Sequence, residues 1–416
     1  MSISDVEKRS DDDVGPPPNG GTKAWTQAIM GHLVAMNTWG FLTSFGAFQT
    51  YYQSTILKTS SPSDIAWIGS FQLFLIFAVG AFAGRALDAG LFRPVYISGC
   101  LLLLLGVFMT SLASNYWQIF LSQALCSGLG SGLMFTPSIG LVATYFSTKK
   151  VFIMAFYLTG AGTGGMVFPA VVSHLLPRIG FPSTMRVLGY IMLGTSALTI
   201  SLFRTRLPPR TTGPLVEWGA FKERTYVLYV TGMWFNFFAL YFAFFYVGAY
   251  GRTIIGLPYK SAINLLITTN GVGILARLIV SLIATKWTGP INAVIPFALI
   301  SAILLYTWTA VQSTAGLYTF AVLYGFSSNG VQGLWPGGLS SLTADDSKLG
   351  ARMGMAFTLA SVALLTGPPV GGALISLNNG EYLYAQIWAG SCLVVGSCFL
   401  IAARVAKTGF VAVAKA

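Results

Sequence analysis

The chain has 416 residues, of which 54% are hydrophobic and only 9% are charged. Soluble globular chains carry roughly 25% charged residues, so this composition excludes a protein whose whole surface faces water. The net charge is +12, but the Lys and Arg residues stand mostly between apolar runs, where they act as topology signals rather than as a nucleic-acid surface. The apolar runs are about 20 residues long, a length that predicts membrane-spanning helices and not barrel strands.

The predicted elements follow in chain order. Residues 1–22 are polar and acidic and lack the basic start of a signal peptide, so we expect a disordered cytosolic tail. Apolar runs near 25–50, 65–87, 94–113, 117–145, 151–176 and 184–203 make a first half over 23–204. A cytosolic linker is expected at 205–225. Runs near 226–250, 261–285, 290–311, 315–341, 352–377 and 382–405 make a second half over 226–405, and 406–416 is a short cytosolic tail. The predicted fold class is therefore an all-α membrane protein with twelve transmembrane helices in two pseudo-repeated six-helix halves.

The distribution of positive charge predicts the orientation. With both termini in the cytosol, 18 of the 24 Lys and Arg residues lie on the cytosolic side. On the opposite side are Lys58, Arg178, Arg186, Arg252 and Lys260, and Arg277 lies within a span. Because short cytosolic loops carry the excess of positive charge, this split favours cytosolic N- and C-termini.

The two halves share a pattern of small residues and proline. In span 4, Gly128 and Gly132 precede Pro137, and in span 10 Gly330 precedes Pro336. Gly128 and Gly132, like Gly160 and Gly164 of span 5, have the small-xxx-small spacing that lets helix backbones approach closely. Parallel six-helix repeats of this kind are typical of secondary transporters, whose substrate lies between the halves near the midplane.

The loop between spans 2 and 3, residues 84–94, resembles the loop motif of the major facilitator superfamily. In that family an acidic and a basic residue of this loop latch helix ends on the cytosolic side. Asp88 and Arg93 match the pattern, and Lys149 and Lys150 enter span 5 on the same side. The resemblance therefore assigns these four residues to a conformational latch, whereas solvated loop charges are the alternative.

Two further stretches are similar to signatures of the monocarboxylate porter family within that superfamily. They are residues 19–25, which open span 1, and residues 145–150, although Asn19 replaces the acidic residue that the family has there. Residues 37–52 resemble the fungal branch, whose members import carboxylates or export secondary metabolites. The resemblance covers residues 19–405 and implies an organic anion as substrate.

Arg277 is the most informative single residue because it lies in the middle of span 8. A charged side chain at the bilayer centre costs about 2.5–3.5 kcal/mol on insertion scales, and none of the twelve Asp and Glu residues lies deep in a span. A substrate carboxylate is therefore the expected partner, and the porter family likewise has a span-8 arginine for its anion. The family often has an acid one turn earlier, where this chain has Gly273. An Arg277 that reaches a helix end or binds helix carbonyls is the alternative.

Other polar and aromatic residues are candidates for lining the substrate cavity. The set that we assign to substrate binding beside Arg277 is Asn37, Trp39, Ser44, Asn236, Tyr241, Asn329 and Trp335. Ser44 is the nearest equivalent of a lysine that the mammalian-type porters have in span 1. His32 is the proton-coupling candidate, since histidine titrates near neutral pH. Helix packing or a hydrogen-bonded core position is the alternative for each of these residues taken alone.

We expect a secondary transporter that moves a small organic molecule, favouring a monocarboxylate or other organic anion, by alternating access. Export of a secondary metabolite and a non-transporting metabolite sensor are the alternatives. The sequence has no phosphate-binding Gly-rich motif with Lys and no cluster of metal ligands, so we expect no enzyme activity, cofactor or metal. The expected partners are the substrate and the lipid bilayer, without nucleic acid, and the expected state is a monomer. Proton coupling and facilitated diffusion both stay open, and the plasma membrane is favoured over the vacuolar membrane.

Overall fold

The computed structural model describes residues 15–208, 216–343 and 346–410, apart from the side chains of Asp88, Val151 and residues 346–348. In chain order its helical segments are α2 (Gly21–Ala35), η2 (Met36–Gly40), α3 (Phe41–Thr43), α4 (Phe45–Tyr51), η3 (Tyr52–Ile56), α5 (Pro62–Asp88), α6 (Phe92–Thr110), α7 (Tyr116–Ile119), η4 (Phe120–Cys126), α8 (Ser127–Ala143), α9 (Lys150–Leu202), η5 (Trp218–Lys222), α10 (Arg224–Thr253), α11 (Tyr259–Ile283), η6 (Ala284–Thr288), α12 (Pro290–Trp308), α13 (Thr314–Ser341), α14 (Asp346–Leu377) and α15 (Leu383–Thr408). Segment η5 is a 3₁₀ helix and the other η segments are π-helical. All regular secondary structure in the described ranges is helical, which confirms the predicted fold class.

Nine helical stretches of the described chain are long and apolar enough to cross a membrane. One of them contains α9, which has 53 residues and would be about 80 Å long if straight, against a hydrocarbon core of roughly 30 Å. It reverses direction at Gly180, whose φ of 73° is left-handed, and so supplies spans five and six. The first span is divided among α2, η2, α3, α4 and η3, and the tenth is the Gly- and Ser-rich α13. With these the described chain makes twelve crossings.

Hydropathy predicts a loop at 177–183, between spans five and six, but the chain there stays helical on both sides of a single glycine. Gly180 alone accommodates the turn, because a left-handed φ costs a residue without a Cβ very little. Pro182 follows two residues later, and it is tolerated there because the first turn of a helix has amide groups without helical partners. The turn is therefore much shorter than hydropathy indicates.

Local chemistry sets several of the other helix ends. Ser61 caps α5, since its hydroxyl accepts from Asp64 N at 3.1 Å and Asp64 Oδ2 accepts from Ser61 N at 3.1 Å. This reciprocal pair is a capping box, and Pro62 at the first helical position strengthens the start. The hydroxyl of Ser313 caps α13 by accepting from Gly316 N at 3.1 Å. Helices α5 and α13 therefore begin where a serine side chain replaces a missing helical partner.

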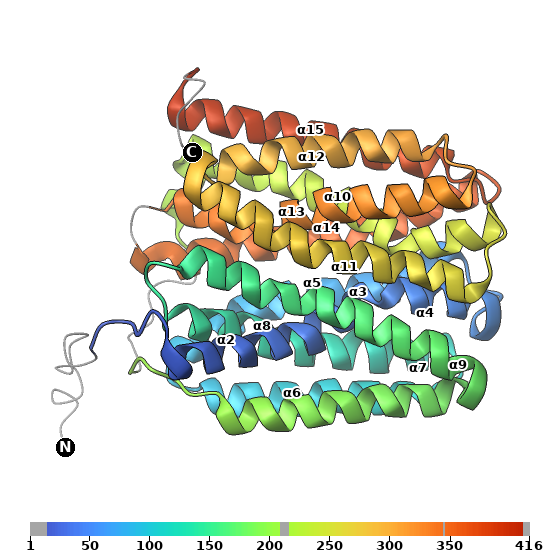
Figure 1. Cartoon of the computed structure of the whole chain (residues 1–416), viewed down its shortest axis with the longest axis horizontal. Coiled ribbons are helices and arrows are strands. Elements are labelled where there is room, and N and C mark those ends of the chain that lie inside the picture. The colour runs from blue at the N-terminus through green and yellow to red at the C-terminus, as the bar shows by residue number, and fades with distance from the viewer. Residues whose placement is uncertain (1–14, 209–215, 344–345, 411–416) are drawn as a thin grey trace.

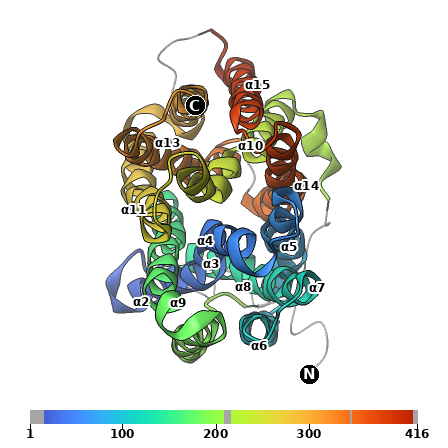
Figure 2. The ribbon, with the colours of Figure 1, turned by 90° about the vertical axis from the view of Figure 1, so that its right-hand side faces the viewer.

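The helices run roughly parallel to one axis, and α2 begins at the same end of the bundle as α15 ends (Figure 1). We call this the terminal end and the opposite one the far end. Segments up to α9 form the lower half in Figure 1 and those from α10 onward the upper half. Viewed along the helices, α11 lies against α9 on one side and α14 against α5 on the other (Figure 2). These two pairs join the halves.

The predicted small-residue pairs lie at close helix contacts. A Cβ on Gly132 would come within 2.6 Å of Leu75 O in α5, and one on Gly164 within 2.5 Å of Met36 O and 2.7 Å of the Cα of Gly40. No side chain fits at such distances, so backbones pack directly against each other there. The prediction that this spacing permits close helix approach is confirmed.

Candidate substrate-binding site

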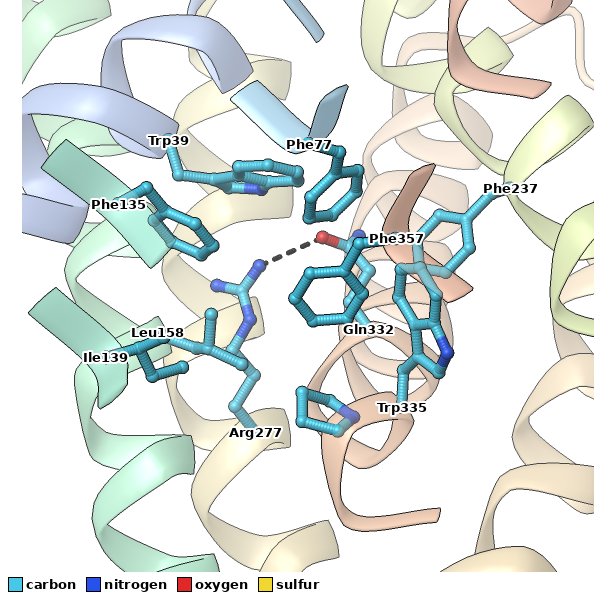
Figure 3. Close-up of a pocket in the computed structure, with 11 residues that line it drawn as sticks. Trp39, Phe77, Phe135, Ile139, Leu158, Phe237, Arg277, Gln332, Trp335 and Phe357 are labelled. Atoms are coloured by element: carbon cyan, nitrogen blue, oxygen red, sulfur yellow. Dashed lines mark hydrogen bonds between the residues drawn. The ribbon is translucent and has the colours of Figure 1, made fainter. Parts of the chain in front are cut away.

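A buried cavity lies between the two halves, with Arg277 in its wall (Figure 3). Trp39, Phe77, Phe135, Ile139 and Leu158 line it from the first half, and Phe237, Arg277, Gln332, Trp335, Pro336 and Phe357 line it from the second. The space left for the centres of water-sized molecules is about 30 Å³, which is enough for about two waters. A larger organic substrate therefore needs the halves to move apart.

Arg277 projects from α11 and is only 2% exposed. Its Nη2 donates to Gln332 Oε1 at 3.2 Å, and the hydroxyl of Tyr241 donates to the same oxygen at 2.9 Å. Nε and Nη1 of Arg277 have no hydrogen-bond partner among the described residues. A buried guanidinium with free N–H groups is costly, so the site is built to receive hydrogen-bond acceptors.

Two neighbouring groups add further donors without partners in the described chain. They are Nε2 of Gln332 and Nε1 of Trp335, and both side chains line the cavity from α13. Gln332 thus uses its oxygen to hold Arg277 and keeps its amide N–H groups available. An excess of donors around one positive charge suits the oxygens of a carboxylate or another acidic group.

The rest of the wall is aromatic. The ring of Trp39 is stacked on Phe135 with centroids 5.3 Å apart, and it lies 5.0 Å from Phe77. Phe357 lies 4.8 Å from both Phe77 and Trp335. In Figure 3 these rings surround the guanidinium and Gln332 from several sides. Such rings pack well against flat or apolar parts of a ligand, so the site combines one charged anchor with an aromatic enclosure.

The halves are joined by hydrogen bonds at the far end. The hydroxyl of Tyr246 in α10 donates to Pro62 O at 3.1 Å and to Pro368 O at 3.2 Å. Ser63 at the start of α5 donates to Pro369 O in α14 at 2.9 Å. These contacts hold the two halves together at the far end.

The cavity lies nearer to the terminal end. Ile139 is four residues before the end of α8, and Pro336 is five residues before the end of α13. At 1.5 Å per residue these positions are about 6–8 Å from the helix ends. In the described conformation the site is therefore displaced toward the end that carries the first and last helices.

Comparison with known proteins decides the family. Residues 28–344, more than half of the chain, match the family described as Major Facilitator Superfamily. This chain belongs to the major facilitator superfamily. An "MFS-type transporter" of Gibberella zeae is 43% identical over 394 residues, covering 94% of this chain and 89% of that protein. The "MFS-type transporter dbaD" of Emericella nidulans is 34% identical, covering 92% of this chain and 87% of the relative. The "Aspyridones efflux protein apdF" of the same fungus is 32% identical, covering 94% and 79%.

The superfamily prediction is thus confirmed, as is a likeness to fungal transporters that include a secondary-metabolite efflux protein. The assignment to the monocarboxylate porter family stays a prediction. Facilitators are transporters and not enzymes as a class, so the membership agrees with the expectation of a carrier that moves a small molecule across a lipid bilayer.

Three of the residues predicted to bind substrate line the cavity, and they are Trp39, Arg277 and Trp335. Tyr241 lies beside it and reaches Arg277 through Gln332. Trp39 belongs to η2, and π-helical turns of this kind are frequent at functional sites.

The other four predicted residues do not line the cavity, and their side-chain donors bond elsewhere. Asn236 donates to Gly232 O at 2.8 Å, Asn329 donates to Gly325 O at 2.7 Å, and Ser44 donates to Gly40 O at 2.7 Å. Asn37 donates to Thr195 Oγ1 at 2.8 Å, across to α9. In this conformation they contact helix backbone or a neighbouring helix instead of the cavity.

His32 lies between α2 and α9. Its Nδ1 is 3.1 Å from Thr159 Oγ1 and its Nε2 is 3.1 Å from Thr163 Oγ1. Both ring nitrogens therefore have a hydroxyl partner, and the ring is not part of the cavity wall. A proton-coupling role for His32 stays a prediction, and any such role has to act at the α2–α9 contact.

Of the predicted latch, the side chain of Asp88 lies outside the described part of the chain. Arg93 and Lys149 are exposed and Lys150 is half-buried. The two stretches that resemble porter signatures meet nearby: Asn19 Oδ1 accepts from Ser147 N at 2.6 Å and from Thr148 N at 3.1 Å. Asn19 thus caps the turn before α9, a role that the acidic residue of the signature is also able to fill.

A second buried arginine, Arg352, forms ion pairs near the terminal end of α14. Arg352 Nε donates to Glu217 Oε2 at 2.5 Å, and its Nη1 donates to Glu223 Oε2 at 2.9 Å. The guanidinium also lies 5.7 Å from the ring centroid of Tyr226. This arginine clamp fastens the linker residues before α10 to the start of α14. It could not be foreseen from sequence spacing, because the acids and the arginine are more than 120 residues apart.

Proposed function

We propose that this facilitator exports a secondary metabolite that carries an acidic group on a flat, largely apolar body. Arg277, with Gln332 beside it, binds the acidic group, and the rings of Trp39, Phe135 and Phe357 enclose the body. The observation that carries the proposal is the fully buried guanidinium, inside an aromatic wall, with two nitrogens that lack partners among the described residues. Charged N–H groups to carboxylate oxygens make the strongest of the common hydrogen bonds.

Export is favoured by the relatives. One relative is named as an aspyridones efflux protein. With 18 of 24 positive residues on the side of the termini, the terminal end is cytosolic under the positive-inside rule. A site that lies toward this end is nearer to the cytosol in the described conformation, a state that both export and uptake pass through. We propose the plasma membrane as the location of the protein, with both termini inside.

Alternating access follows from the same contacts. When the bonds of Tyr246 and Ser63 at the far end break, the halves rock around the cavity and open it outward. Uptake of a monocarboxylate is the second candidate function, and it is favoured by the porter-like stretches at residues 19–25 and 145–150. The two functions share the anion site and differ in direction.

The proposal is tested in proteoliposomes by comparing the transport of two labelled compounds. One is [14C]cinnamate, a flat aromatic carboxylate, and the other is cinnamamide, its neutral amide. We expect Arg277-dependent counterflow of cinnamate and little transport of the amide. Arg277→Gln should lower the rate at least about tenfold, since one lost charged hydrogen bond is worth about 1.5–3 kcal/mol. Arg186→Gln is the matched control, because Arg186 is exposed and lies away from the cavity.

Equal transport of acid and amide, or an Arg277→Gln rate equal to that of the wild type, would contradict the anion site. Direction is measured in yeast cells that express the transporter and are loaded with cinnamate. Export predicts faster loss of label than in cells that express Arg277→Gln, whereas faster accumulation from the medium would favour uptake instead.

A further inference from the structure

The charge of Arg277 has no acidic counterpart in the membrane part of the chain. The sequence contains no Asp or Glu at 65–87, 89–216, 224–344 or 347–380. Asp64 and Asp88 stand within the first and last three residues of α5, at its two ends. Among the described residues, no carboxylate therefore lies inside a span where it would neutralise Arg277.

The groups that surround the guanidinium are neutral amides and rings. Gln332 contacts it directly, and the position one helical turn before it is Gly273. A Cβ at Gly273 would collide with the side chain of Asn329, which is fixed by its bond to Gly325 O at 2.7 Å. Residues one turn apart on a helix face the same side, so the place from which an acid on α11 would reach Arg277 is filled by an uncharged amide.

The net charge of the cavity at Arg277 therefore differs between the transporter with bound substrate and the empty transporter. With a bound monoanion the guanidinium and the acid form a neutral pair. Without it a bare cation is enclosed whenever both ends of the cavity are shut, and a cation in the membrane interior is expensive unless it is paired. Every return of the empty transporter has to pass through that state.

We infer that this transporter works mainly as an exchanger, which carries one organic anion outward and another inward. The inference rests on the proposed function, in which Arg277 binds the acidic group. The loaded form reorients readily in both directions, and the empty form reorients slowly. Net export of one anion is therefore slow unless a second organic anion is bound for the return.

The test compares uptake of [14C]cinnamate at pH 7.5 into two kinds of proteoliposome. One kind contains unlabelled cinnamate, and the other contains buffer with sucrose at equal osmolarity. We expect the initial rate into cinnamate-loaded vesicles to be at least about tenfold higher. Equal rates into both kinds would overturn the inference, because the empty transporter would then return as fast as the loaded one.

Gln332→Glu tests the cause. It keeps the shape of the side chain and places a carboxylate where an oxygen now lies 3.2 Å from Arg277 Nη2. The empty site then has its own counter-ion, so uptake into the sucrose vesicles should become faster and the ratio of the two rates should fall toward one for that reason. Gln332→Leu is the matched control, which removes the amide without adding charge and should retain the high ratio. A ratio unchanged by Gln332→Glu would overturn the inference.

If the proposed function is wrong, the same uptake experiment gives a different result. In that case the wild type takes up no cinnamate into either kind of vesicle beyond the level of Arg277→Gln. That result overturns both proposals, whereas Arg277-dependent uptake at equal rates overturns the exchange mode alone.

Discussion

Gly164 is one of the glycines at which α9 packs directly against the backbone of the first span. In Gly164→Ala the new Cβ would lie 2.5 Å from Met36 O and 2.7 Å from the Cα of Gly40. Ordinary contact begins near 3.4 Å, so the two helices have to separate by about 0.9 Å or bend. Both obstacles are backbone atoms, which have no rotamer to change. We expect the folded state to lose about 1–3 kcal/mol, the usual cost of overpacking.

The matched control is Gly194→Ala in the same helix. A Cβ on Gly194 would meet nothing within 4 Å, so replacing glycine inside a helix should stabilise it by about 0.5–1 kcal/mol. Replacing glycine by alanine should therefore lower the stability of the folded state at position 164 and raise it at position 194 of the same helix. Thermal unfolding of the purified protein in one detergent, followed by size-exclusion chromatography, measures both. A Gly164→Ala protein as stable as Gly194→Ala would refute the close packing described for α9 and η2.

Two further changes test the arginine clamp and the aromatic wall. Glu217→Gln removes a carboxylate from the side chain of Arg352, and since these side chains are only 14% and 7% exposed we expect a loss of about 1.5–3 kcal/mol. Glu223→Gln should cost less than about 1 kcal/mol, because Glu223 is 46% exposed and its charge is screened by water; equal costs would contradict this ranking. Trp39→Ala opens the cavity beside Phe135 and should weaken binding of cinnamate about tenfold, while unchanged affinity in a titration would exclude Trp39 from the site.

The spans and Arg277 could be predicted from sequence, because each differs strongly in polarity from its surroundings. An apolar run of about 20 residues matches the thickness of a bilayer and is longer than most soluble core helices, and Arg277 is the only Lys or Arg placed in the middle of such a run. The cost of burying charge in a membrane makes such a residue conspicuous. The tight turn at Gly180 could not be predicted, because hydropathy does not register a reversal made by a single residue.

The aromatic wall could not be predicted in the same way. Phe77, Phe135 and Phe357 are apolar residues in apolar spans, where a ring that faces lipid and a ring that faces substrate have the same hydropathy. Conversely, several polar residues in the spans were predicted to line the cavity and do not. Asn236 and Asn329 bond to carbonyls of their own helices one turn earlier, an option open to any amide in a span. Which face of a helix meets the cavity depends on packing between distant spans.

The central claim is that Arg277 recognises the acidic group of the substrate. The most direct test is the ratio of binding affinities for cinnamate and cinnamamide, measured by titration of the purified wild-type and Arg277→Gln proteins. We predict that the wild type prefers the acid at least about tenfold and that the substitution brings the two affinities close together. A preference for the acid that survives Arg277→Gln would contradict this claim.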